Sequence, residues 1–278
     1  MKKKSGFSIV YISLVLLLLY LPILIVVIYS FNGNSSRTAA VRFQGFSLQW
    51  YKGLFNPISG YGRQLVSSLE VAFWSVLISA VIGTLGAFSS IKRQKIKGLR
   101  SKIYSGMENI AMLPIMIPEI ILAIAFMTLF SKLNLPFGKL TLVLAHVSFC
   151  IPYILITVKS RLSTIDPALE EAARDLGASP FRAFMTVSLP LVAPGVISGS
   201  LLAFAMSMDD FVISFFVNGA ETSTLPIKIY SSVKVGVTPK VNALCTVMLM
   251  SVFLVFAVVQ VISDVQEKKK AVNIEERI

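Results

Sequence analysis

Charged residues are scarce in this sequence. Asp, Glu, Lys and Arg make up only 14% of the 278 residues, whereas 55% are hydrophobic, and the mean hydropathy is +0.77. So few charges cannot give a water-soluble domain its polar exterior. The composition therefore excludes that class and indicates an integral membrane protein.

Side chains suited to catalysis or metal binding are also few. The two cysteines, Cys150 and Cys245, lie in apolar runs without CxxC spacing, which excludes a disulfide framework and a zinc site. The single histidine, His146, lies in a similar run and is expected to be a hydrogen-bonded packing residue. No GxxxxGK(S/T), HExxH or GxSxG motif occurs. We expect no metal site and predict that the chain is not an enzyme.

Long apolar runs determine the fold class. The hydrocarbon core of a bilayer is about 30 Å thick and needs roughly 20 apolar residues in a helix. Six segments reach that length: 9–30, 66–90, 106–130, 139–158, 190–217 and 241–263. The sequence predicts an all-α membrane protein with six transmembrane helices in a single domain over residues 1–278.

The positive charges indicate the orientation. The formal net charge of +12 could signal nucleic acid, but the charges flank the apolar segments. Most of the 26 lysines and arginines lie on the side of the two termini, in 2–4, 92–102, 159–182 and 268–277. Because positive loops stay in the cytoplasm, both termini and the segment 166–190 are predicted to be cytoplasmic. The basic excess is assigned to topology and membrane lipid, not to nucleic acid.

The segment 166–190, between two apolar runs, is polar and sharply punctuated. Asp166 before a proline is typical of an N-cap, and Gly177 is typical of a left-handed helix end. Ser179 before Pro180 repeats the start signal, and Pro190 is expected to end the second helix and open the next span. The pattern predicts a hairpin of two short helices. An amphipathic loop resting on lipid is the open alternative.

The spacing in this hairpin carries a family resemblance. Glu171-Ala172-Ala173, three residues, Gly177, nine residues and Val187-x-Leu189-Pro190 follow one another. This pattern resembles the EAA loop of permease subunits of bacterial ATP-binding-cassette (ABC) importers, which has isoleucine where Val187 stands. The resemblance implies a type I ABC importer permease fold with a cytoplasmic coupling-helix hairpin. The implied ATPase-coupling residues are Glu171, Ala172, Ala173, Gly177, Leu189 and Pro190.

The same resemblance implies partners. In that family the hairpin docks in a cleft of a separate ATPase subunit and transmits its closure to the spans. The expected assembly holds two ATPase subunits, a second homologous permease subunit and an extracytoplasmic binding protein, in the bacterial plasma (inner) membrane. ATP and Mg would be used by the partner ATPase, and this chain itself would bind no cofactor.

Three acidic residues lie inside predicted spans, where a charge costs about 2.5–3.5 kcal/mol on insertion scales. Glu119 follows Pro114 and Pro118, which could kink the third span, and Asp209 and Asp210 lie toward the outer end of the fifth. No lysine or arginine lies at comparable depth, so a cation, a proton or water must compensate them. The three acids are the candidate substrate pathway. Pairing with a basic residue of a partner subunit, or contact with a water-filled seam, remains the alternative.

A carboxylate-lined path suits an ammonium substrate with an alkyl linker. The runs 207–216, 224–231 and 233–239, with Phe46–Tyr51 in the first outer loop, resemble the spermidine/putrescine permease family. This resemblance spans Phe46 to Ile262 and implies a polyamine importer that works by alternating access and receives its solute from the binding protein.

Other interpretations of the outer loop, the solute and the mode of transport remain open. Trp50 and Tyr51 are candidates for an outer-loop ligand contact, although an aromatic anchor at the headgroup level is the simpler explanation. The solute could be another one, such as ferric ion. A secondary cation transporter, with Glu119 and Asp209 as a proton relay, would need neither ATP nor a partner.

Overall fold

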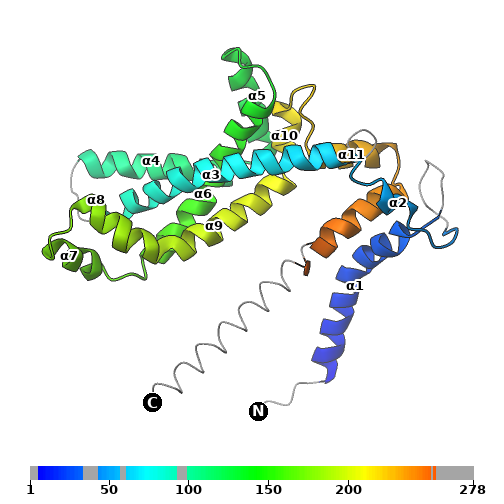
Figure 1. Cartoon of the computed structure of the whole chain (residues 1–278), viewed down its shortest axis with the longest axis horizontal. Coiled ribbons are helices and arrows are strands. Elements are labelled where there is room, and N and C mark those ends of the chain that lie inside the picture. The colour runs from blue at the N-terminus through cyan, green and yellow to red at the C-terminus, as the bar shows by residue number, and fades with distance from the viewer. Residues whose placement is uncertain (1–5, 34–42, 57–60, 93–98, 252, 255–278) are drawn as a thin grey trace. The chain divides into compact units, whose positions relative to one another are not determined.

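The structure is a computed structural model of the chain and describes residues 6–33, 43–56, 61–92, 99–251 and 253–254 (Figure 1). Throughout this part of the chain the secondary structure is helical, and an isolated bridge between Asn32 and Phe46 is its only β pairing. The all-α prediction is confirmed. Besides a helix at 239–251, the elements are α1 (Gly6–Ser30), α2 (Gln49–Lys52), α3 (Gly62–Lys92), α4 (Leu99–Met116), α5 (Glu119–Lys132), α6 (Lys139–Leu162), α7 (Ala168–Asp175), α8 (Pro180–Ala183), the π-helical turn η2 (Phe184–Ser188), α9 (Leu189–Asp209), α10 (Val212–Val217) and α11 (Leu225–Val235).

Four helical stretches among the described residues are long and apolar enough to cross a membrane: Ser8–Ser30, Gly62–Ser90, Lys139–Leu162 and Pro180–Asp209. A bent pair, Ser105–Met116 with Glu119–Lys132, passes the same test when taken together. Of the predicted sixth span, 241–263, the stretch after Leu254 falls outside the described residues. The count of six therefore stays a prediction.

Contacts along the chain group its residues into two compact units. One comprises residues 1–63 with 229–278, and the other comprises residues 64–228. The hairpin and the three acidic residues all belong to the second unit. The single-domain organisation stays a prediction.

The predicted third span is not one continuous helix. α4 ends at Met116, α5 begins at Glu119, and the two helices meet at an angle of 113°. Pro118 between them has an extended backbone, with φ −52° and ψ 130°. A proline disfavours helical geometry at the residue before it and cannot donate a backbone hydrogen bond. The break places Glu119 in the first turn of α5.

The predicted fifth span is interrupted as well. α9 ends at Asp209, and Asp210 is extended, with ψ 118°. The carboxylate of Asp210 accepts hydrogen bonds from the backbone N–H groups of Ile213 and Ser214, at 3.2 and 2.8 Å. This is the bonding of an N-cap, and it starts α10 where α9 stops. The break is therefore built by the side chain of Asp210.

The helix boundary predicted at Pro190 is wrong. α8, η2 and α9 form one uninterrupted helix from Pro180 to Asp209, so the second arm of the hairpin is the beginning of a span. In η2 the N–H of Leu189 bonds to the carbonyl of Phe184, five residues back. A π turn widens the helix just before Pro190, which relieves the clash that its ring would make with the carbonyl of Thr186.

Small residues on α9 allow close contact with α6, and the two helices lie side by side (Figure 1). These residues recur at every fourth position and are buried: Gly195, Gly199, Ala203 and Ser207. A Cβ atom added to Gly195 would lie 2.8 Å from Cβ of Arg161. Further along, the thiol of Cys150 lies 3.6 Å from the carbonyl oxygen of Ala203. Such a stripe brings backbones together where lipid supplies no hydrophobic drive. We call this contact the α6–α9 seam.

Two other helices pack on α6. On α3, the hydroxyls of Ser75 and Ser79 donate to the carbonyls of Val143 and Val147, at 3.2 and 3.1 Å. An ion pair between Glu70 and Lys139 joins the same two helices, and another between Glu108 and Lys159 joins α4 to α6. α6 is thus the central helix of this unit.

Adding one methyl group to the seam should destabilise the fold. In a Gly199→Ala variant the new Cβ would collide with the hydroxyl of Thr157 and lie 3.0 Å from Cα of Ile154. Overpacking of this kind costs about 1–3 kcal/mol, so we expect a lower Tm in detergent. Gly106→Ala on α4 is the matched control, because its Cβ would meet nothing within 4 Å and its Tm should be unchanged or higher. Equal Tm values for the two variants would contradict the seam's role.

Candidate functional site

The hairpin has the turn chemistry that the sequence indicates. The Asp166 carboxylate accepts from the backbone N–H of Ala168 at 2.9 Å, at the start of α7. Gly177 has φ +87°, the left-handed geometry that ends α7, and the N–H of Ala178 bonds back to Ala173 at 3.1 Å. Ser179 caps α8 by accepting from the N–H of Arg182 at 3.3 Å. The tight turn between the two arms is thus fixed by local bonds.

The residues of the EAA pattern leave much of the hairpin surface exposed. Glu171, Ala172, Gly177 and Pro190 are exposed, while Ala173 and Leu189 are half-buried. Two large apolar side chains stand beside them, Leu176 at 90% and Phe181 at 69% exposure. Apolar groups gathered around small residues on a polar segment are typical of a surface that contacts another protein.

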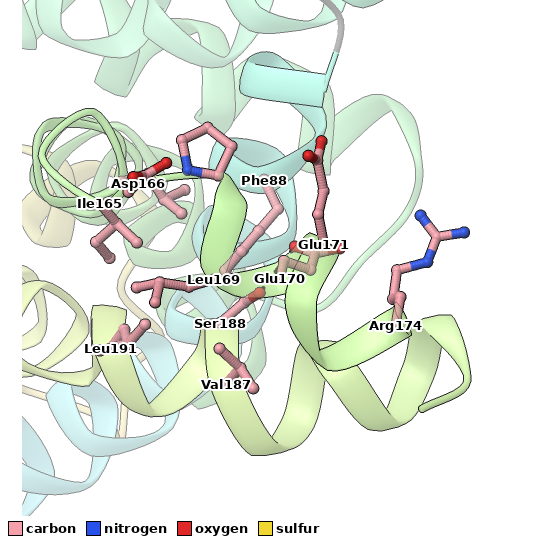
Figure 2. A pocket seen from close by; sticks show the side chains of 12 residues that line it. Phe88, Ile165, Asp166, Leu169, Glu170, Glu171, Arg174, Val187, Ser188 and Leu191 are labelled. Atoms are coloured by element: carbon pink, nitrogen blue, oxygen red, sulfur yellow. Dashed lines mark hydrogen bonds between the residues drawn. The ribbon is translucent and has the colours of Figure 1, made fainter. Parts of the chain in front are cut away.

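A pocket of about 310 Å³ lies under α7 (Figure 2). It is lined by apolar side chains of α3, α6, α7, η2, α9 and the loop before α7, and by polar and charged side chains of the hairpin: Phe88, Leu162, Ile165, Asp166, Pro167, Leu169, Glu170, Glu171, Arg174, Val187, Ser188 and Leu191. The hydroxyl of Ser188 donates to the carboxylate of Glu170 at 2.8 Å, which ties α7 to η2. We call this space the hairpin pocket.

A second cavity, of about 260 Å³, lies where both spans break. Pro114, Ile117 and Glu119 line it from the first break and Asp210 and Ile213 from the second. Glu119 and Asp210 therefore line one cavity from the two breaks. We call it the carboxylate cavity.

Aromatic and apolar side chains complete the carboxylate cavity. Phe149 and Tyr153 line it from α6, Leu122 from α5 and Met206 from α9. Two carboxyl groups beside aromatic faces form a site that can hold a primary ammonium, by charge-assisted hydrogen bonds and by attraction to the rings. The acids were predictable from the sequence, whereas Phe149 and Tyr153 were not, because an aromatic residue in an apolar run gives no signal of its own.

Asp210 is buried within a hydrogen-bonded group of polar side chains. The Ser214 hydroxyl lies 2.7 Å from its Oδ2, and Nε2 of His146 lies 3.3 Å from the same oxygen. The imidazole also bonds to Ser207 through Nδ1, at 2.7 Å, and to Ser214 through Nε2, at 3.1 Å. His146 is hydrogen-bonded as predicted. That its partner would be an acidic residue of another helix could not be read from the sequence.

Asp209 differs from its neighbour. It is the last residue of α9 and its side chain is exposed. The structure thus brings Glu119 and Asp210 into one cavity and leaves Asp209 beside it. In the described part of the chain, no three histidine, cysteine or acidic side chains gather closely enough to hold a metal ion.

The two outer-loop candidates are engaged locally in the first unit. Trp50 donates through Nε1 to the carbonyl of Asn32 at 2.8 Å, and the Tyr51 hydroxyl lies 2.6 Å from the hydroxyl of Ser30. The Tyr51 ring also packs on Phe31, with centroids 5.4 Å apart. These contacts fasten α2 to the end of α1. The ligand contact suggested for Trp50 and Tyr51 stays a prediction.

Comparison with known proteins places this geometry in a family. Residues 96–272 match the family described as the inner membrane component of binding-protein-dependent transport systems. This chain belongs to that family. The family consists of transport permeases of the inner membrane, not of enzymes, and the chain is a multi-pass membrane protein.

Polyamine permeases are similar to this chain over most of its length. The spermidine/putrescine transport system permease protein PotC of Haemophilus influenzae is 40% identical over 231 residues, which cover 83% of the chain and 86% of the relative. PotC of Escherichia coli strain K12 is 42% identical over 83% of the chain and 84% of the relative. The putrescine transport system permease protein PotI of the same strain is 37% identical over 91% of the chain and 89% of the relative. The resemblance noted from the sequence is confirmed.

A solved structure matches the fold. It is a crystal structure of a bacterial ABC transporter involved in the import of the acidic polysaccharide alginate, with a TM-score of 0.64. The match covers 95% of this permease and 98% of the other chain at 16% sequence identity. This likeness supports the ABC importer permease fold and carries no information on the solute.

The bond between Ser188 and Glu170 should hold α7 on the permease. A Ser188→Ala change removes a hydrogen bond to a carboxylate, worth about 1–2 kcal/mol at a partly buried site. We expect faster hydrogen exchange in the amides of α7, measured by mass spectrometry. Ser163→Ala is the matched control, because the Ser163 hydroxyl bonds only locally, to the carbonyl of Ser160 at 2.8 Å. Equal protection of α7 in both variants would show that other contacts hold it.

Proposed function

We propose that this chain is the permease subunit of an ATP-driven, binding-protein-dependent importer of polyamines that works by alternating access. The observation that carries the solute class is the carboxylate cavity, which is lined by Glu119 and Asp210 together with Phe149 and Tyr153. A polyamine combines ammonium groups with short alkyl linkers, and the cavity offers carboxylates and apolar walls. The relatives named as spermidine/putrescine and putrescine permeases support the same class.

The acids are the proposed solute path. Glu119 and Asp210 lie at the breaks of two helices, where the chain departs from regular helix at membrane depth. Irregular backbone inside a membrane is tolerated where it lines a cavity or is buried in protein. Asp209, exposed next to Asp210, extends this path by one more carboxylate.

The exposed hairpin is the proposed docking site for a separate ATPase. Its coupling residues are Glu171, Ala172, Ala173, Gly177, Leu189 and Pro190. Two ATPase subunits, a second homologous permease and an extracytoplasmic binding protein would complete the assembly, with ATP and Mg used only by the ATPase. The hairpin and both termini would face the cytoplasm, as the distribution of lysine and arginine favours.

The other functions considered are less well supported. A secondary transporter works without an ATPase, so it leaves the capped, exposed hairpin with the EAA spacing unexplained. The relatives named above are permeases of transport systems. Carboxylates could also bind ferric ion, but the relatives named above are spermidine/putrescine and putrescine permeases, which favours a polyamine.

Removing the charge of the acids should slow uptake. Asp210→Asn deletes the charge at nearly the same size, and its one amide oxygen can keep part of the cap of α10, whose two backbone N–H groups now bond to different carboxylate oxygens. We expect Asp210→Asn and Glu119→Gln each to lower spermidine uptake by the reconstituted importer about tenfold or more, as for the loss of a charge-assisted hydrogen bond. Asp209→Asn tests the neighbouring position. Unchanged uptake in all three variants would remove the acids from the path.

Bulk at the hairpin turn should uncouple transport from ATP hydrolysis. A Cβ at Gly177 would touch nothing within 4 Å in this chain, so a bulky side chain there would clash only with a partner; the backbone strain that φ +87° puts on any L residue is shared by the control below. Gly177→Trp should leave the protein inserted and ATP hydrolysed, yet lower the solute imported per ATP by about tenfold. Gly177→Asn is the control, because asparagine tolerates the left-handed backbone and is small. Normal coupled uptake with tryptophan would contradict the docking role.

A further inference from the structure

His146 is the residue that joins the two sides of the break between α9 and α10. It projects from α6, and its ring is almost completely buried, at 1% exposure. Nδ1 meets Ser207 near the end of α9, and Nε2 meets Ser214 in α10. One imidazole therefore contacts both helices that flank Asp210.

The hydrogen-bond donors and acceptors around His146 select one tautomer of a neutral ring. The Ser214 hydroxyl donates to Oδ2 of Asp210, so its oxygen can accept from N–H at Nε2 of His146. Nδ1 then accepts from the hydroxyl of Ser207. In this arrangement every polar group has a complementary partner, and Nε2–H also lies toward Oδ2 of Asp210, at 3.3 Å.

The consequence for Asp210 is an unequal use of its two oxygens. Oδ2 accepts from the backbone N–H and the hydroxyl of Ser214 and faces Nε2 of His146. Oδ1 accepts from the backbone N–H of Ile213. Oδ1 therefore keeps the larger spare capacity to accept a hydrogen bond, and Asp210 is a lining residue of the carboxylate cavity.

We infer that His146 is a positioning residue for solute passage: it fixes Oδ2 of Asp210 to the α9–α10 junction and so orients Oδ1 for an ammonium group in the carboxylate cavity. This inference rests on the proposed function, because it assigns the orientation of a carboxylate in the proposed path. His146 does not line the cavity, and its effect on transport passes through Asp210.

Two amide substitutions separate positioning from packing. The amide nitrogen of glutamine reaches the position of Nε2, whereas that of asparagine reaches only the position of Nδ1. His146→Gln therefore keeps a donor toward Asp210, and His146→Asn keeps a partner only for Ser207. We expect spermidine uptake by the reconstituted importer to stay within about threefold of the unmodified protein with glutamine and to fall about tenfold with asparagine or leucine.

The matched control is Cys150→Ala, one helical turn along the same face of α6. Cys150 packs in the seam, 3.6 Å from the carbonyl of Ala203, and does not line the carboxylate cavity. Its variant should lower Tm about as much as the His146 variants and leave uptake unchanged. A similar loss of uptake in Cys150→Ala, or equal uptake with glutamine and asparagine at position 146, would overturn the inference.

A double-mutant cycle tests the route of the effect. If His146 acts through Asp210, then His146→Asn should have little further effect, below about twofold, in an Asp210→Asn background. Independent, multiplicative losses would overturn the inference and leave the proposed path intact. If Asp210→Asn alone left uptake unchanged, Asp210 would not belong to the solute path, and the positioning role would fail with it. The two failures are therefore distinguishable in one set of variants.

Discussion

Close contact between α6 and α9 is the constraint on which the rest of this unit depends. The stripe formed by Gly195, Gly199, Ala203 and Ser207 leaves no room for larger side chains, since a Cβ at Gly199 would lie 3.0 Å from a backbone atom of α6. Because lipid does not drive helices together, such contact must come from packing and hydrogen bonds. At its last position the stripe ends in a polar residue, Ser207, which meets His146. The seam thus places His146 of α6 beside Ser207, where the polar side chains around Asp210 can bond to one another.

The same helix that forms the seam also connects the two candidate sites. From Pro180 to Asp209 the helix is continuous, so the hairpin arm and the seam belong to one rigid element of about 45 Å at 1.5 Å per residue. Within that range the π turn at Phe184–Ser188 lies next to the hairpin pocket, and Pro194 removes one further backbone hydrogen bond. A displacement of the hairpin would therefore reach the α9–α10 break without passing through a flexible joint in the membrane. This continuity would connect the proposed docking site of the ATPase to the carboxylate cavity.

Buried polar groups explain why the chain breaks two spans where it does. An interrupted helix leaves backbone groups without partners, and at membrane depth each must be satisfied by protein. Asp210 satisfies the first N–H groups of α10, and His146 with Ser214 in turn satisfies Asp210. At the other break Pro118 removes one donor outright. Each break therefore presents an acidic residue, Glu119 or Asp210, at a small structural cost.

Local chemistry made the hairpin predictable. Gly177 and Ser179 behave as the sequence indicates, since a left-handed helix end and a hydroxyl cap depend on neighbours within a few residues. Helical class and apolar length likewise follow from composition. The continuity through Pro190 was not predictable, because a π turn absorbs the proline. The pairing of Asp210 with His146 of α6 was not predictable either, since only the packing of α9 on α6 decides which distant side chains meet. The sequence by itself determined helices, caps and the family pattern through short-range rules. Tertiary structure alone decided the carboxylate cavity, because its walls come from five helices, α4, α5, α6, α9 and α10.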